Sequence, residues 1–195
     1  MRLVIISGLI GSGKSTISKL LKRKGYHYLN ADKIAKDIIL GNEKVQNKLV
    51  KSFGSNVVFN NNVSIIKLRR KLISSKSNKK IIEDIVHPYF FRYINPLINK
   101  LKGYNVVLEL PLLDTCKKIS HSYKIITVDC SLKNRLRRVI KKRGITRLEF
   151  LHINKMQASR SFYLDNADYI LPNNDTMSVL NKKFEKLYLN NLMSK

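Results

Sequence analysis

Cysteine and long apolar runs are both scarce in this sequence of 195 residues. Its two cysteines, Cys116 and Cys130, stand in different segments without C-x-x-C spacing, which argues against a zinc site and favours a reducing, cytoplasmic compartment. We interpret each as a small buried hydrophobic residue. The apolar start, 3–6, is too short for a secretory signal or a membrane span, and no other run approaches spanning length. No association with a membrane is therefore expected.

Acidic residues are also few, with 13 Asp and Glu against 38 Lys and Arg, a formal net charge of +25. A single anion-binding site would account for only a handful of these cations. Nucleic-acid binding is one interpretation, and a compositional bias toward Lys, Asn and Ile is the other. The lysines are scattered over nearly every expected helix, and no basic and aromatic interleaving typical of an RNA-binding module occurs. We favour the biased, solvated surface, and we expect no specific nucleic-acid partner.

A complete phosphate-binding loop is present in G-x-x-x-x-G-K-[ST] form from Gly8 to Ser15. It follows an apolar run and precedes a helical pattern, which is the context that this loop requires. Glycines let the backbone fold around a diphosphate, and the following helix presents its positive end to the anion. Lys14 is expected to reach the β- and γ-phosphates, and the Ser15 hydroxyl to ligate magnesium. A glycine-rich turn without a ligand is the less favoured alternative.

Apolar strands alternate with amphipathic helices, which predicts an α/β fold with a parallel sheet in one domain, 1–195. We expect five strands, at 3–6, 26–29, 104–108, 125–128 and 169–171, and a last helix from about 176 to 192. Residues of about 38–100 are predicted to form a helical insertion. The cationic segment of about 132–161 is predicted to form a pair of helices, either a mobile lid over phosphates or a solvated helix face.

Asp32 closes the triplet Asn30-Ala31-Asp32 at the carboxyl end of the second expected strand, where open parallel sheets bind their ligands. A carboxylate there can orient or deprotonate an attacking hydroxyl. Its alternative role is to cap the helix that begins near Lys33. The chain lacks the N-K-x-D motif of GTPases and the length of a motor protein, so a small-molecule kinase is favoured.

These residues come in the order seen in dephospho-CoA kinases, and the sequence resembles that family over nearly its whole length. The resemblance rests on the loop Gly8–Thr16, Asn30–Asp32, Phe53-Gly54, Ile82–Pro88, Pro111–Leu113, Val128–Ser131, Arg138, Gln157, Ala167-Asp168 and Asn173. It implies a P-loop NTPase three-layer fold with a substrate-binding insertion and a lid. It also implies transfer of the ATP γ-phosphoryl group to the 3′-hydroxyl of dephospho-CoA, the last step of coenzyme A biosynthesis.

The resemblance assigns roles by position, with ATP as phosphoryl donor and Mg²⁺ as its companion ion. It implies catalytic roles for Lys14, Asp32 and Arg138. It implies ATP binding by Gly11, Ser12, Gly13, Lys14, Ser15, Thr16 and Asn173. Substrate binding is implied for Asp32, His87, Pro111 and Leu112, and metal binding for Ser15 and, through water, Glu109. A helix break ending at Pro88 is an alternative explanation for the His87-Pro88 pair.

The chain departs from the family pattern at three places. Asn30 replaces an Asp, Asp114 and Thr115 stand where the family has an aromatic residue followed by Glu, and Tyr163 replaces a basic residue. The change at Asn30 spares the catalytic aspartate. The losses of Glu at Thr115 and of the basic residue at Tyr163 bear on substrate affinity, and neighbouring Asp114 and Arg160 are the candidates to replace the lost charges.

Two other functions stay open from the residues alone. One is another small-metabolite or nucleoside kinase of the P-loop fold, and the other is a nucleotide- or RNA-binding protein without turnover. No feature of the sequence points to an oligomeric state.

Overall fold

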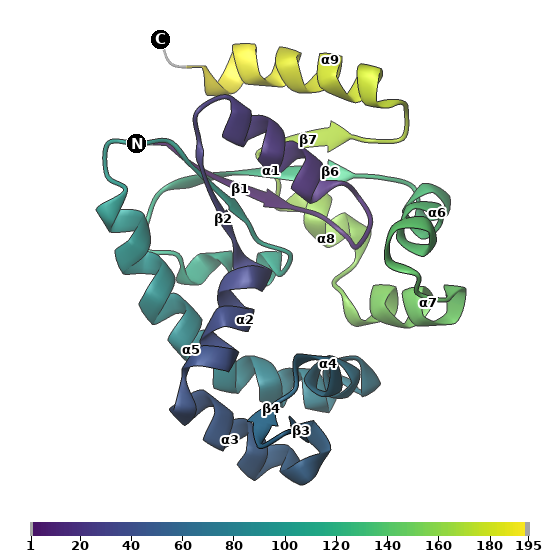
Figure 1. Cartoon of the computed structure of the whole chain (residues 1–195). Coiled ribbons are helices and arrows are strands. Elements are labelled where there is room, and N and C mark those ends of the chain that lie inside the picture. The colour runs from purple at the N-terminus through teal and green to yellow at the C-terminus, as the bar shows by residue number, and fades with distance from the viewer. Residues whose placement is uncertain (1, 194–195) are drawn as a thin grey trace.

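The computed structural model describes residues 2–193 and centres on a parallel sheet of five strands (Figure 1). The strands are β1 (Leu3–Ser7), β2 (His27–Asn30), β5 (Val106–Glu109), β6 (Tyr123–Asp129) and β7 (Tyr169–Pro172), in the spatial order β2-β5-β1-β6-β7. Each neighbouring pair is parallel. The predicted α/β class and five-stranded parallel sheet are therefore confirmed.

Alternation along β1 shows how the two faces of the sheet are covered. Leu3 and Ile5 pack with α5 (Lys76–Lys100) and α8 (Arg160–Asp165). Val4 and Ile6 pack on the other face with α1 (Lys14–Arg23) and α9 (Met177–Leu187), and a π-helical turn, Tyr188–Leu192, follows α9. Both faces are buried, which explains why the central strands read as continuous apolar runs. The result is the three-layer arrangement visible in Figure 1.

The helical insertion follows β2 and has an apolar core of its own. It comprises α2 (Ala31–Gly41), α3 (Glu43–Phe53), the 3₁₀ turn η1 (Gly54–Val57), the hairpin strands β3 (Val58–Phe59) and β4 (Asn62–Val63), α4 (Ile65–Ser74) and the first half of α5. Side chains of Asn42, Ser64 and Ser75 cap the first turns of α3, α4 and α5, which fixes where each of these helices begins. A role for residues 38–100 in substrate binding stays a prediction.

Helix α5 runs through Pro88, so the alternative of a helix break there is wrong. Proline removes one backbone donor and destabilises a helix interior. Here one side of the helix stays buried on both sides of the proline, at Val86, Phe90, Ile94 and Ile98. Burial of such side chains is worth about 1.5–3 kcal/mol each, which is enough to offset the proline.

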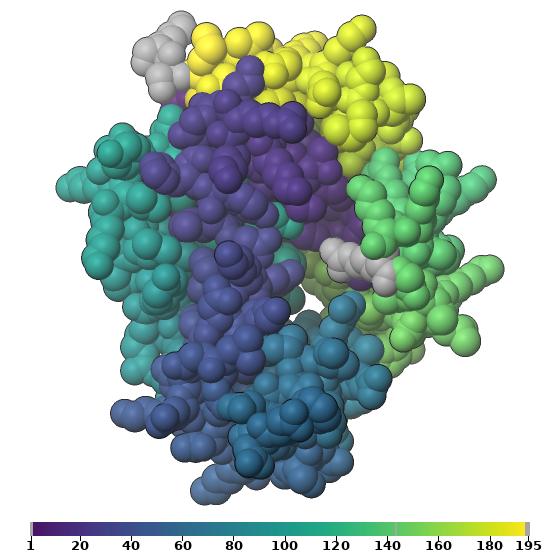
Figure 2. All heavy atoms as spheres, viewed as in Figure 1, coloured from purple at the N-terminus to yellow at the C-terminus, as the bar shows by residue number. Residues whose placement is uncertain are grey.

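The predicted lid segment contains two helices, α6 (Leu132–Arg143) and α7 (Arg147–Met156), joined at Gly144. A 3₁₀ helix, η2 (Leu113–Lys118), follows β5 on the opposite side of the sheet from α1. In Figure 2 the surface is hollowed between the insertion, in blue, and α6 and α7, in green. Within residues 2–193, no helix combines the length and the apolar character needed to cross a membrane.

Candidate active site

The loop Gly8–Ser15 connects β1 to α1 in a conformation that only glycine adopts easily. Gly11 has a φ of +79° and Gly13 a φ of +109°, both in the left-handed region. A Cβ at Gly11 would lie 2.8 Å from the carbonyl oxygen of Arg135, and one at Gly13 would collide with the Asn173 amide. Glycine is therefore required here both by the turn and by what packs against the loop.

Lys14 lies back over this loop. Its Nζ donates to the carbonyl oxygens of Gly8, at 2.8 Å, and of Leu9, at 3.2 Å. The Ser12 hydroxyl beside it is buried and has no hydrogen-bond partner within the described structure. Helix α1 begins at Lys14, within the loop motif, so the positive end of the helix adds to the charge of Lys14. A buried hydroxyl, an ammonium and a helix terminus together suit a phosphate group.

Asn30, and not Asp32, caps helix α2. The Asn30 Oδ1 accepts from the backbone N–H of Lys33 at 2.8 Å. The capping role considered for Asp32 is therefore wrong, because the cap position falls two residues earlier. Asp32 lies exposed in the first helical turn and lines a small pocket of about 70 Å³. That position leaves its carboxylate available to a bound molecule.

The pocket beside Asp32 brings together three segments that are far apart in the sequence. Its other lining residues are Ala31, Ala35, Val86, His87, Phe90, Phe91, Leu110, Pro111, Leu112 and Thr115. Three predicted substrate residues, His87, Pro111 and Leu112, thus share it with Asp32. Burial, followed by the nearby Lys118 ammonium, lowers the pKa of His87. The imidazole is therefore neutral near pH 7 and can accept or donate a hydrogen bond.

Glu109 ends β5 beside the end of β2 and is largely buried. Its Oε2 accepts from the Tyr28 hydroxyl at 2.5 Å, and the Asn30 amide lies 3.0 Å from the same hydroxyl and 3.5 Å from the carboxylate. Burial, together with the Glu109 carboxylate, raises the pKa of Tyr28 to about 12, so the phenol stays a donor. The Asn30 amide can donate into this cluster, which an Asp carboxylate there cannot. This gives the Asp-to-Asn departure a local reason.

The other two departures meet at the loop after β5. The Tyr163 hydroxyl donates to the Pro111 carbonyl at 2.9 Å, and the Thr115 hydroxyl donates to the Leu112 carbonyl at 2.7 Å. Burial, followed by Asp114, raises the pKa of Tyr163 to about 12. Both replacements therefore use neutral hydroxyls to hold the Pro-Leu-Leu backbone. Arg160, considered as a substitute cation, forms a two-point ion pair with Asp129 at 2.8 and 2.6 Å.

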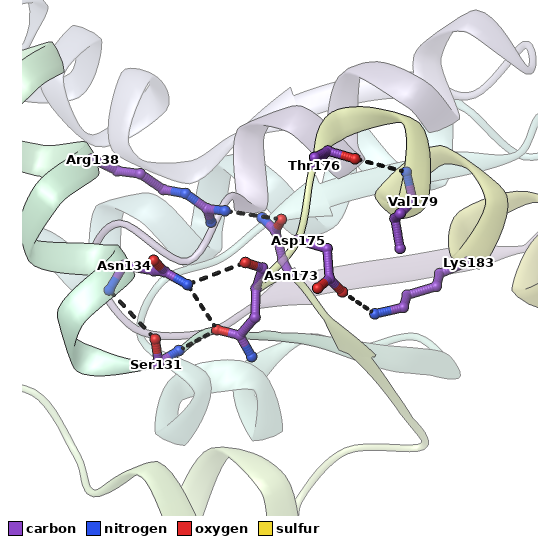
Figure 3. Close-up of polar contacts among 9 residues, drawn as sticks. Ser131, Asn134, Arg138, Asn173, Asp175, Thr176, Val179 and Lys183 are labelled. Carbon is purple, nitrogen blue, oxygen red and sulfur yellow. Dashed lines mark hydrogen bonds and ion pairs between the residues drawn. The ribbon is translucent and has the colours of Figure 1, made fainter.

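Arg138 and Asn173 contact each other beside the phosphate-binding loop (Figure 3). The Asn173 amide donates to the Ser12 carbonyl at 2.7 Å, while Arg138 donates to the Asn173 Oδ1 and the Ser12 carbonyl at 3.3 and 3.4 Å. Arg138 also lies 3.3 Å from the Cys130 Sγ. Burial raises the pKa of that thiol, and both cysteines are free and buried. In this structure the two predicted site residues hold the backbone of the loop.

Sequence reasoning missed Arg135, which contacts the loop from α6. Its side chain is only 4% exposed, and its Nη1 donates to the carbonyl of Ile10 at 3.3 Å and to the Asn154 Oδ1 at 2.7 Å. The available signal was its spacing of three from Arg138, which places both residues on one side of a helix. Gln157, one of the residues that carry the family resemblance, accepts from the Ile10 N–H through its Oε1 at 2.9 Å.

Comparison with known proteins agrees with this arrangement. The family model described as dephospho-CoA kinase matches residues 2–178. A dephospho-CoA kinase of Hydrogenovibrio crunogenus is 30% identical over 190 residues, covering 96% of each chain. One of gamma-proteobacterium EBAC31A08 is 34% identical over 186 residues, covering 94% of this chain and 93% of its own.

Solved structures extend the comparison to the fold. A crystal structure from Thermus thermophilus superposes with a TM-score of 0.82 at 28% identity and covers 99% of this chain and 98% of its own. A Campylobacter jejuni dephospho-CoA kinase gives a TM-score of 0.68 at 21% identity, covering 97% of this chain and 96% of its own. A shikimate kinase of Bacteroides thetaiotaomicron gives 0.53 at 14% identity, covering 96% of each chain, and this likeness concerns the fold alone.

Proposed function

The chain belongs to the dephospho-CoA kinase family, and we propose that the loop Gly8–Thr16, Asp32 and the pocket beside Asp32 carry out its reaction. The protein is an ATP-dependent kinase that phosphorylates the 3′-hydroxyl of dephospho-CoA in the last step of coenzyme A biosynthesis. The observation that carries the proposed site is the position of Asp32. Asp32 is among the residues that line the pocket formed by α2, α5 and the segment after β5, and Asn30 instead of Asp32 caps α2.

We infer the following division of labour for the transfer. The loop and the α1 terminus hold the ATP phosphates, with Gly11, Ser12, Gly13, Lys14, Ser15 and Thr16 as the contact residues. Asp32 orients the 3′-hydroxyl and accepts its proton as the oxygen bonds to the γ-phosphorus. The bond from that phosphorus to the β-γ bridging oxygen breaks, and ADP leaves. Lys14 neutralises charge that builds up on the phosphoryl oxygens during the transfer.

We propose that Mg²⁺ accompanies ATP, held by the Ser15 hydroxyl and, through water, by Glu109. These residues suit the ion because magnesium prefers oxygen ligands and keeps several waters. The Glu109 carboxylate is held in place by the hydrogen bond from the Tyr28 hydroxyl. Within residues 2–193, no three His, Cys, Asp or Glu side chains lie close enough together to hold a metal by themselves. When bound, the ion shields the β- and γ-phosphate charges from the incoming hydroxyl.

We propose that Arg138 and Asn173 support the nucleotide site from the side of α6 and β7. Both contact the Ser12 carbonyl, so they fix the loop whose N–H groups receive the phosphates. The Arg138 guanidinium is then well situated to turn from this carbonyl to a phosphate oxygen when ATP binds. Residues 132–161 act in this proposal as the lid over the nucleotide, and His87, Pro111 and Leu112 contact the acceptor.

The acceptor specificity tests the proposed site directly. Dephospho-CoA is expected to exceed adenosine and AMP by roughly 10²-fold in kcat/KM, because its pantetheine and diphosphate arms supply two or three further contacts of about 1 kcal/mol each. That remote binding energy helps to align the 3′-hydroxyl with Asp32. The measurement is ADP release with the three acceptors at matched concentrations. Equal or better turnover of adenosine would point instead to a nucleoside kinase of the same fold.

One surface feature bears on the alternative of RNA binding. An open groove of about 810 Å³ on the insertion is lined by Lys67, Arg70 and Lys71 and by Phe59, whose residue surface is 63% exposed. Cations beside an exposed aromatic ring are typical of single-strand binding surfaces. Lys67 already donates to the Val58 carbonyl at 2.7 Å, however, and the remaining basic residues are spread over the molecule. We propose that the net charge of +25 does not form a binding site for a specific nucleic acid.

RNA binding is therefore expected to be weak, with a Kd of roughly 10⁻⁶ to 10⁻⁴ M at physiological salt, and independent of sequence. Filter binding against several RNAs at rising salt measures it. The double variant Arg70→Gln/Lys71→Gln is expected to weaken binding no more than Lys141→Gln/Lys142→Gln, which removes the same charge from α6. Tight, sequence-selective binding that only the groove variant loses would contradict this proposal.

We also propose a cytoplasmic location. Two free, buried thiols, Cys116 and Cys130, suit a reducing compartment, and both substrates of the reaction are small molecules. Fractionation of cells that express the protein at its native level tests this, and its recovery with the membranes would contradict it.

A further inference from the structure

In the phosphate-binding loop, both backbone polar groups of Ile10 are hydrogen-bonded to side chains of the lid segment, 132–161. The Ile10 N–H donates to the Gln157 Oε1 at 2.9 Å, and the Ile10 carbonyl accepts from the Arg135 Nη1 at 3.3 Å. The Ile10 side chain packs with Val139 of α6 and Phe150 of α7. The loop conformation therefore depends on where the lid lies, because its backbone shares hydrogen bonds with lid side chains.

The same end of the lid is also attached to the insertion. The Met156 carbonyl, directly before Gln157, accepts from the Lys79 Nζ at 2.9 Å. Lys79 is at the start of α5, where Glu83 lies 3.6 Å away as its ion-pair partner and both side chains are only about a fifth exposed, at 21% and 24%. A second contact joins the ring of His152 in α7 to the carbonyl of Ile73 in α4.

These contacts form a short continuous path between the two substrate sites. Helix α5 carries His87 and Phe90, which line the pocket beside Asp32, and it also carries Lys79. Lys79 holds Met156, the next residue is Gln157, and Gln157 holds the Ile10 N–H of the loop. A charged donor in a partly buried position makes a stronger hydrogen bond than a neutral one. The contact of Lys79 with the Met156 carbonyl is therefore the strongest hydrogen bond of this path.

We propose that Lys79 and Gln157 are positioning residues that couple binding of the acceptor to binding of ATP. An acceptor in the pocket holds α5 in place, α5 holds the end of the lid through Lys79, and Gln157 then sets the loop for the phosphates. Neither residue touches the reacting atoms. The inference rests on the proposed function, because it takes ATP to bind at the loop and dephospho-CoA at the pocket.

The test measures the affinity of a non-hydrolysable ATP analogue by calorimetry, with and without saturating dephospho-CoA. In the unmodified protein, the acceptor is expected to tighten analogue binding by about fivefold or more, the usual range of coupling between sites. Lys79→Met is expected to bring this factor close to one while leaving the affinity for the analogue alone unchanged. Lys79→Arg keeps a charged donor and is expected to retain most of the coupling. Lys80→Met, an equal loss of charge on the next, exposed residue, is the matched control.

A second variant separates coupling from folding. Gln157→Leu is expected to lose the coupling as well, and the double variant Lys79→Met/Gln157→Leu to lose no more than either single one, since both act on one path. Melting temperatures of all variants establish that they are folded. No coupling in the unmodified protein, unchanged coupling in Lys79→Met, or an equal loss in Lys80→Met would overturn the inference. Failure of the unmodified protein to bind the analogue or to phosphorylate dephospho-CoA would instead contradict the proposed function.

Discussion

Lys14→Ala is expected to reduce phosphoryl transfer to dephospho-CoA by at least about 10³-fold while leaving the fold intact. The Lys14 ammonium is the charged donor of the loop, and its present acceptors are the carbonyls of Gly8 and Leu9 inside that loop. No backbone donor can replace a charge that has to reach the β- and γ-phosphates. The loss therefore falls on the transition state, in which negative charge spreads over the transferring oxygens.

The same variant is expected to change the free energy of unfolding by less than about 1 kcal/mol. Lys14 is only partly buried, and its side chain belongs to none of the apolar clusters that hold the sheet. ADP release and thermal melts of the purified variant measure the two effects. Lys19→Ala, an exposed lysine on the same helix, is the matched control and is expected to keep normal turnover. Near-normal phosphoryl transfer by Lys14→Ala would contradict the proposal that this loop binds the phosphates of ATP.

The sheet could be predicted from the sequence because its strands are short apolar runs separated by unambiguous signals. The run before Gly8 and the glycine pattern after it fix a strand, a loop and a helix within the first part of the chain. At Pro88 the alternative of a helix break is wrong, because burial of Phe90 and its neighbours in α5 outweighs the cost of the proline. The alternative of a capping role for Asp32 is wrong because Asn30, two residues earlier, takes the cap, and a catalytic role for Asp32 stays a prediction.

The contacts that hold the phosphate loop could not be predicted because they join distant parts of the chain. Gln157 lies 147 positions from Ile10, and Asn173 lies 161 positions from Ser12. The composition around Arg135 indicates only a basic helix, and its side chain is buried because α6 packs directly against Gly11. A cationic run therefore contains both solvated residues and a structural arginine, and its pattern does not separate them.

The two departures at Thr115 and Tyr163 illustrate a similar limit. In sequence they are losses of charge that bear on substrate affinity. In the structure their hydroxyls bind the backbone of Pro111 and Leu112, two residues that line the pocket beside Asp32. The replacements therefore contribute to the shape of the acceptor pocket, a role that the loss of charge alone does not reveal.

Asp32→Asn is expected to lower kcat by about 10² to 10⁴-fold with dephospho-CoA, the usual range for a positioned acid-base group. The affinity for ATP is expected to change little, because the loop lies on β1 and Asp32 follows β2, two strands separated by β5 in the sheet. Asparagine keeps the size of the side chain but cannot accept the proton of the 3′-hydroxyl. Initial rates at varied ATP and dephospho-CoA give kcat and both KM values for the variant.

Asp37→Asn provides the matched control for this experiment, since Asp37 is also exposed on α2 and loses the same charge. It is expected to keep normal kcat, whereas Asp32→Asn is not. Loss of a helix cap cannot explain a fall in kcat, because Asn30 already supplies the cap and is untouched in both variants. The interaction of Asp32 with the helix dipole is worth only about 0.3–1 kcal/mol, so the melting temperature is expected to shift by a few degrees at most. An unchanged kcat in Asp32→Asn would therefore mean that the 3′-hydroxyl loses its proton to another group, and the pocket would then bind the acceptor without activating it.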